Sequence, residues 1–161
     1  MTGPGSAHTE REVSAMQAAF FQADRTVRGW LPGAVFCPAR AELLTRRPWA
    51  LLAFTAEGCR LFEKSAQLCR ARTLILPGEW GTTAVRQCRA EQIVTYGSAP
   101  RDSLTVSSLG EHTVLVCLQR RLICPNGRVL EAQERSVPRW SRDLEKTLAV
   151  AALRLLLGRD D

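Results

Sequence analysis

Apolar runs alternate with helical segments through the middle of the chain. Trp49 to Thr55 is a continuous apolar run, typical of a strand that is buried on both faces, and shorter runs follow at Thr73 to Leu76 and Gln92 to Thr95. A helix from about Glu57 to Arg70 is expected between the first two runs, and a helix from Thr82 or Thr83 to Arg89 between the second and third. This order predicts an α/β fold with a short parallel sheet and flanking helices.

After Tyr96-Gly97 the hydrophobic pattern changes to a period of two. Apolar and polar residues alternate from Leu104 to Ser108 and from Val114 to Leu118, and Pro125-Asn126-Gly127 is typical of a tight hairpin turn. These segments predict an antiparallel meander that extends the parallel sheet. The chain is expected to close with a helix that begins at Ser141, its N-cap, and stops at Gly158.

The N-terminal third has a different pattern. Apolar residues at helical spacing predict an extra helix from Thr9 to Arg28, and residues 30 to 48 are rich in proline and glycine, with a short helix expected around Ala39 to Leu44. We therefore divide the chain into an N-terminal helical arm and linker, residues 1 to 48, and an α/β core domain, residues 49 to 161.

The net charge of +6 and the isoelectric point near 9.4 favour an acidic partner. Only Lys64 and Lys146 are lysines, so almost all of the positive charge is arginine, spread from Arg11 to Arg159. Because no run gathers this charge and the arginines lack interleaved exposed aromatic residues, nucleic acid is not an expected partner. The expected partners are another protein or a small polar or anionic ligand, and a homo-oligomer is compatible with the sequence.

The chain has no apolar stretch of the roughly 18 residues that a membrane span needs. Its first segment, Met1 to Glu12, is polar and has no secretory core, so we expect a cytoplasmic protein without a membrane partner.

Six cysteines could form three disulfides. Cys59 and Cys69 fall in one predicted helix, and no two cysteines have the Cys-x-x-Cys spacing. Buried, reduced thiols are therefore expected, with a redox pair or a zinc site as alternatives. Only His8 and His112 could add imidazole ligands, and we expect neither a metal ion nor a cofactor.

Two loops are expected at the carboxyl ends of parallel strands, the edge at which open α/β sheets bind ligands. The first contains Gly78, Gly81, Thr82 and Thr83, which follow a strand and open a helix. A phosphate-binding loop would need a lysine here, and Glu79 would repel phosphate, so a simple turn with a capping threonine is the alternative.

The second loop holds Tyr96, Ser98, Arg101 and Asp102, which could face a small anion or polar ligand. In the alternative interpretation, Arg101 and Asp102 cap the loop and form a salt bridge. A nucleophilic triad is not expected, because Ser107-Ser108, His112 and Asp102 lie within one strand-turn segment. We therefore assign no catalytic residue.

Three segments resemble the last part of the central ATP-binding domain of Mur ligases, which add amino acids to cell-wall precursors. Gln92-Ile93-Val94-Thr95-Tyr96-Gly97 is similar to the family strand that ends in Tyr-Gly, and short strands follow it. Thr147-Leu148-Ala149-Val150-Ala151-Ala152 with Leu157-Gly158 is similar to the family's Asn-x-Leu-Ala-Ala helix. The resemblance covers about Thr73 to Gly158. The core also resembles small uncharacterised bacterial proteins that share Val-Thr-Tyr-Gly and Pro-Arg-Asp-Ser-Leu-Thr.

The departures from the family determine what the resemblance implies. Mur ligases hold ATP on a Gly-Thr-x-Gly-Lys-Thr loop that this chain lacks, and Arg142, Asp143 and Lys146 stand where the family has His-Asn and a second Asn. Phosphoryl transfer depends on such positioning groups. The resemblance therefore implies a degenerate domain that acts as a non-catalytic binding or accessory protein. The alternative is a small-ligand or nucleotide-binding enzyme that uses the loops at 78–83 and 97–102.

Overall fold

The computed structural model describes residues 17 to 79 and 86 to 158. In chain order the elements are β1 (Ala18–Phe21), α2 (Arg25–Arg28), β2 (Val35–Phe36), the 3-10 helix η1 (Ala41–Leu44), β3 (Trp49–Phe54), α3 (Ala56–Ser65), β4 (Cys69–Pro77), β5 (Cys88–Tyr96), β6 (Leu104–Leu109), β7 (Thr113–Leu118), β8 (Leu122–Ile123), β9 (Val129–Leu130), β10 (Gln133–Pro138) and α5 (Leu144–Leu156). No helix within these described ranges is both long and apolar enough to cross a membrane.

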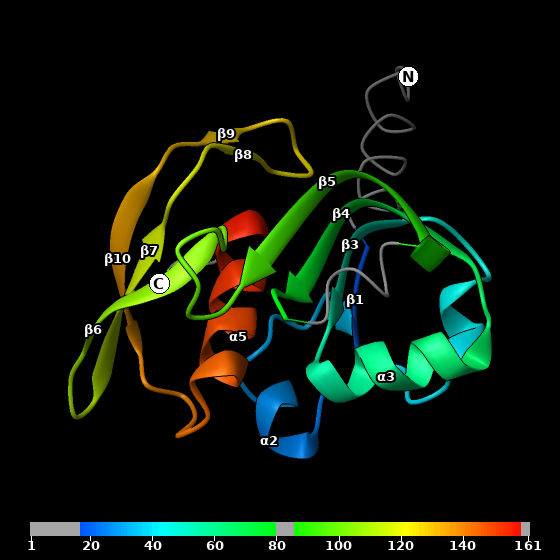
Figure 1. Ribbon diagram of the computed structural model, residues 1–161, viewed down its shortest axis with the longest axis horizontal. Helices are drawn as coiled ribbons and strands as arrows, with labels where there is room; N and C mark the ends of the chain where they lie inside the picture. The colour runs from blue at the N-terminus through cyan, green and yellow to red at the C-terminus, as the bar shows by residue number, and fades with distance from the viewer. Residues whose placement is uncertain (1–16, 80–85, 159–161) are drawn as a thin grey trace, which may run out of the picture.

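The described residues form one large mixed sheet and one small hairpin (Figure 1). The large sheet has the strand order β10-β7-β6-β5-β4-β3-β1-β2. Its strands from β2 to β6 pair in parallel, whereas β6, β7 and β10 pair antiparallel. Strands β8 and β9 form the hairpin at the predicted turn, where Gly127 has a φ of 87°. The predicted α/β fold, a parallel sheet extended by an antiparallel meander, is confirmed.

Helices cover both faces of the parallel strands, which explains the continuous apolar runs. All six residues of β3 are buried, and alternate side chains enter two separate cores because successive residues of a strand point to opposite faces. Leu51 and Val94 pack with α5 in one core, and Leu52 and Phe54 pack with α3 in the other. Helices α3 and α5 accordingly lie apart on either side of β3, β4 and β5 (Figure 1).

The predicted N-terminal helix from Thr9 to Arg28 is wrong over most of its described part. Ala18–Phe21 form β1, a fully buried strand between β3 and β2, and only Arg25–Arg28 are helical. The stretch Thr9 to Met16 lies outside the described residues. Four consecutive apolar residues suit a strand with both faces covered, and burial of both faces favours the strand over the helical spacing. One sheet therefore runs across the boundary that we predicted at residue 48.

Two further helix boundaries differ from the prediction. Helix α3 ends at Ser65 because Ala66 adopts a left-handed conformation, with a φ of 54°, so Cys69 begins β4 and is not helical. Strand β5 already begins at Cys88, where a helix through Arg89 was expected. The start of that predicted helix falls on residues 80 to 85, outside the described ranges.

The closing helix agrees with the prediction except at its first turn. The N-cap of α5 is Asp143, whose Oδ1 accepts a hydrogen bond of 3.0 Å from the Glu145 N–H, and not Ser141. Gly158 follows the helix with a φ of 74°, the left-handed conformation in which a glycine commonly ends a helix.

Candidate functional site

The carboxyl ends of β4 and β5 hold the two loops in which we predicted ligand contacts. Gly78 and Gly97 follow these strands, and the carboxylate of Asp102 packs against both backbones. A Cβ atom on Gly78 would overlap Asp102 Oδ1, and one on Gly97 would lie 2.6 Å from Oδ2. Oδ2 accepts a hydrogen bond of 3.0 Å from the Ala99 N–H, and Oδ1 has no hydrogen-bond partner among the described residues. Asp102 is only 2% exposed and contacts both loops.

The other residues predicted for this edge are split between core and surface. The Tyr96 hydroxyl donates a 2.6 Å hydrogen bond to the Phe54 carbonyl, and burial raises the pKa of the phenol well above its usual value. Tyr96 therefore ties β5 to the end of β3. Ser98 and Arg101 are exposed, and Arg120 donates to the Arg101 carbonyl over 2.7 Å. Gly81, Thr82 and Thr83 lie outside the described residues.

Four acidic side chains lie near one another at this edge. Desolvation raises the pKa of Glu145, and the nearby negative charges of Asp143, Glu79 and Asp102 raise it further. A bound anion would meet the same repulsion. In the part of the chain that the structure describes, no group of three or more His, Cys, Asp or Glu side chains is placed to hold a metal ion.

Replacing Gly78 with alanine should lower the free energy of unfolding by about 1–3 kcal/mol, because the added methyl group must displace the Asp102 carboxylate. Urea denaturation followed by circular dichroism measures the difference. Gly33→Ala is the matched control, because its Cβ would meet nothing within 4 Å. Equal stabilities for the two variants would contradict the packing of Asp102 on Gly78.

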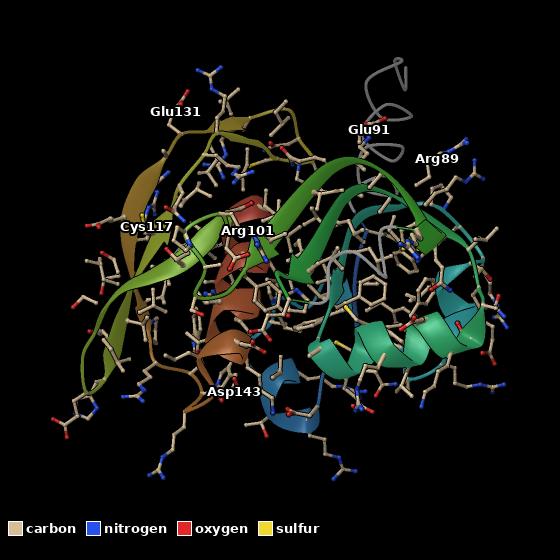
Figure 2. All side chains as sticks on the ribbon, in the orientation of Figure 1. Arg89, Glu91, Arg101, Cys117, Glu131 and Asp143 are labelled. Atoms are coloured by element: carbon tan, nitrogen blue, oxygen red, sulfur yellow. The ribbon has the colours of Figure 1, made fainter. Side chains whose placement is uncertain are left out.

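A pocket of about 770 Å³ lies at the opposite edge, at the amino ends of β3, β4 and β5. Figure 2 shows Arg89 at the start of β5 and Arg101 beyond its other end. Five arginines line the pocket together with uncharged residues. The lining consists of Thr45, Arg46, Arg47, Pro48, Leu68, Cys69, Arg70, Arg86, Gln87, Cys88 and Arg89.

Local contacts hold the three walls of this arginine pocket. The Arg47 guanidinium lies 4.8 Å from the centre of the Trp49 ring, and the indole N–H donates a 2.9 Å hydrogen bond to the Leu44 carbonyl. These contacts orient the segment that leads into β3. On the other side, Gln87 Nε2 donates hydrogen bonds of 3.0 Å to the carbonyls of Phe62 and Gln67, which fixes the start of β5 against the end of α3.

Two of the pocket arginines lie side by side, and the charge of Arg46 acts on the nearby carboxylate of Glu42. Arg70 and Arg89 are directly opposite in the register of β4 and β5, an arrangement in which like charges are unfavourable. Within the described residues, none of the five lining arginines forms a salt bridge with a carboxylate. An adjoining pocket of about 340 Å³ adds Arg72 and Glu91 to this surface. Guanidinium groups bind carboxylates and phosphates through two parallel hydrogen bonds, so the arrangement suits an anion.

The arginine pocket was not predicted, because its walls come from three segments that are distant in the sequence. One local signal could have indicated it: Cys69-Arg70 and Cys88-Arg89 repeat the same dipeptide, and in the structure each dipeptide begins a strand. Aligning these dipeptides would have placed two arginines side by side.

Comparisons with known proteins give no information about the function of this chain. The chain matches no family model, no curated protein and no solved structure. The resemblance to Mur ligases therefore stays a prediction from short motifs, and the arginine pocket carries the functional argument.

Proposed function

We propose that this chain is a non-catalytic binding protein whose ligand is a small anion held in the arginine pocket. The observation that carries the proposal is the direct opposition of Arg70 and Arg89 beside one cavity that three further arginines line. Such an arrangement costs stability in the free protein, and an anion between the guanidinium groups removes the repulsion.

The dimensions of the pocket suit a small molecule. Ligand sites commonly enclose about 300–1,000 Å³, and the arginine pocket has about 770 Å³. Exposed guanidinium groups attract anions most strongly at low ionic strength, since the screening length is about 10 Å at 0.1 M salt. Phosphorylated or polycarboxylate ligands of nucleotide size fit both the charge and the volume.

The lining favours binding without catalysis. Thr45, Cys69 and Cys88 are the only potential nucleophiles among the described lining residues, and no Asp, Glu or His stands beside them in that lining as a general base. The relation to a degenerate Mur ligase domain belongs to the same proposal. The family's ligands, ATP and UDP-sugar precursors, are anions of the expected class.

Thermal unfolding of the full chain tests the proposal. Pyrophosphate, ATP-Mg and a UDP-sugar cell-wall precursor are added separately, and adenosine serves as the uncharged control. A ligand at about 100 times its dissociation constant adds about 2.7 kcal/mol, which raises the midpoint of a chain of this length by about 5–10 °C. We expect at least one of the anions to raise the midpoint, the shift to shrink with added salt, and adenosine to have no effect.

The other function classes predict different results. The absence of a shift with all three anions would contradict an anion site. Release of ADP in the presence of ATP-Mg and the precursor would establish an enzyme and overturn the non-catalytic assignment. Salt-dependent binding of generic RNA that exceeds the binding of the small anions would indicate a nucleic-acid-binding protein.

A further inference from the structure

The first residues of β4 and β5 are both cysteines, and they lie directly opposite each other. Cys69 pairs with Cys88 in the parallel register, and the two Sγ atoms are 2.6 Å apart. Both are free thiols. Bonded sulfurs in a disulfide are separated by about 2.0 Å, so a small movement of two side chains at the strand ends brings them to bonding distance.

Small molecules have access to this thiol pair through the arginine pocket. Cys69 and Cys88 are 5% and 7% exposed, and both belong to the pocket lining. Each cysteine is followed directly by an exposed arginine, Arg70 or Arg89, of the same lining. The positive charge raises the local concentration of an oxidant that carries carboxylates.

We propose that Cys69 and Cys88 form a reversible disulfide between β4 and β5 by exchange with an acidic low-molecular-weight disulfide, such as oxidised glutathione, in the arginine pocket. The inference goes beyond the proposed function and does not depend on it. The thiol pair and its access to solvent are present whichever anion the pocket binds.

The disulfide forms in two successive exchange reactions. The thiolate of one cysteine attacks a sulfur of oxidised glutathione, the S–S bond of glutathione breaks, and one glutathione thiolate leaves and takes up a proton. The second cysteine then loses its proton and attacks the protein sulfur of the mixed disulfide, which releases the second glutathione thiol. The two cysteines give up two electrons and two protons, and oxidised glutathione becomes two reduced molecules.

The same contacts slow the exchange at neutral pH. The hydrogen bond with Cys69 and the burial of the side chain both raise the pKa of Cys88, so the thiol form dominates at neutral pH. The thiolate is the attacking species, so exchange proceeds through a minor population. The neighbouring Cys59 is 1% exposed and does not belong to the pocket lining, so it is a poor competitor.

Redox titration of the full chain tests the proposal. The protein is equilibrated in glutathione buffers from fully reduced to fully oxidised, denatured in acid, alkylated and digested with trypsin. We expect the number of alkylated thiols to fall by two from the six of the sequence. Because trypsin cuts at Lys64, Arg70, Arg86 and Arg89, residues 65 to 70 and 87 to 89 should be recovered as one disulfide-linked pair of peptides.

Thermal unfolding of the oxidised protein gives an independent readout. A disulfide between Cys69 and Cys88, which closes the loop between these two residues, should raise the unfolding midpoint by about 6–12 °C relative to the reduced protein. In the variant with Cys69→Ser and Cys88→Ser, the same oxidation should leave the midpoint unchanged.

Single variants separate this pair from the other cysteines. Cys88→Ser should stop at a mixed disulfide of glutathione with Cys69, whereas Cys117→Ser, which changes a half-buried cysteine of β7, should still lose two thiols. Full alkylation of all six thiols in the most oxidising buffer would overturn the proposal. A linked peptide pair that joins any other two cysteines would overturn it as well.

Discussion

Replacing Phe20 with alanine should lower the free energy of unfolding by about 3–5 kcal/mol. Phe20 is fully buried in β1, a strand that lies between β3 and β2, and its side chain packs in the core that α5 covers. A large cavity would remain, because pairing with β3 fixes this part of β1 in the sheet and prevents it from collapsing into the space. Guanidinium denaturation of the variant and the parent chain measures the loss.

Phe36→Ala is the matched control for this prediction. Phe36 belongs to the same N-terminal region, but it is 47% exposed and stacks on Trp49 with ring centres 6.1 Å apart. We expect a loss of about 1 kcal/mol, the magnitude of one aromatic pair. A cost of 1 kcal/mol or less for Phe20→Ala would contradict the position of β1 inside the sheet. Because β1 and β2 belong to the sheet, deletion of residues 1 to 48 should disrupt the fold.

Replacing both Arg70 and Arg89 with alanine should weaken anion binding by about 100-fold or more. Each hydrogen bond from a guanidinium to an anion contributes about 1.5–3 kcal/mol, and about 1.4 kcal/mol corresponds to a factor of ten. The stability of the free protein should stay the same or rise slightly, because the substitutions remove two opposed like charges. Calorimetric titration with pyrophosphate and thermal unfolding without ligand measure the two effects.

The control variant carries Arg101→Ala and Arg142→Ala. It loses the same charge, and both arginines are exposed and absent from the lining of the arginine pocket. We expect the anion affinity to fall by less than about threefold, the part due to the change in net charge. Loss of binding in this control, with binding retained in the Arg70 and Arg89 variant, would move the ligand to the loop at 97–102. This result would favour the alternative function, a small-ligand or nucleotide-binding enzyme that uses the loops at the carboxyl edge of the sheet.

The strands and helices with strong local signals could be predicted from the sequence. Trp49–Phe54 was recognised because a strand covered on both faces must be apolar throughout, and the closing helix because its core-facing stripe repeats at helical spacing. The segment Ala18–Phe21 could not be recognised as a strand in this way, because four apolar residues fit a helix as well as a strand. The segment becomes a strand because it pairs with the edge of β3, and the local sequence does not show that this edge is available.

The candidate site was less predictable than the fold. Sequence reasoning placed it at the carboxyl ends of the parallel strands, where the structure brings Gly78, Gly97 and Asp102 together among acidic neighbours. The arginines appeared scattered because Arg46, Arg70 and Arg89 belong to different strand starts. Their proximity depends on the parallel order of β3, β4 and β5, and sequence distance does not report it.

The sequence by itself determined the α/β class, the hairpin turn at Gly127 and the end of α5 at Gly158, because each follows from periodicity or from the backbone freedom of one glycine. The tertiary structure alone decided that residues 18 to 21 are a strand and that Cys69 lies opposite Cys88. It also decided that five arginines gather at the amino edge of the sheet. The physical reason is that these features depend on the pairing and register of distant strands, whose free energy comes from contacts between segments.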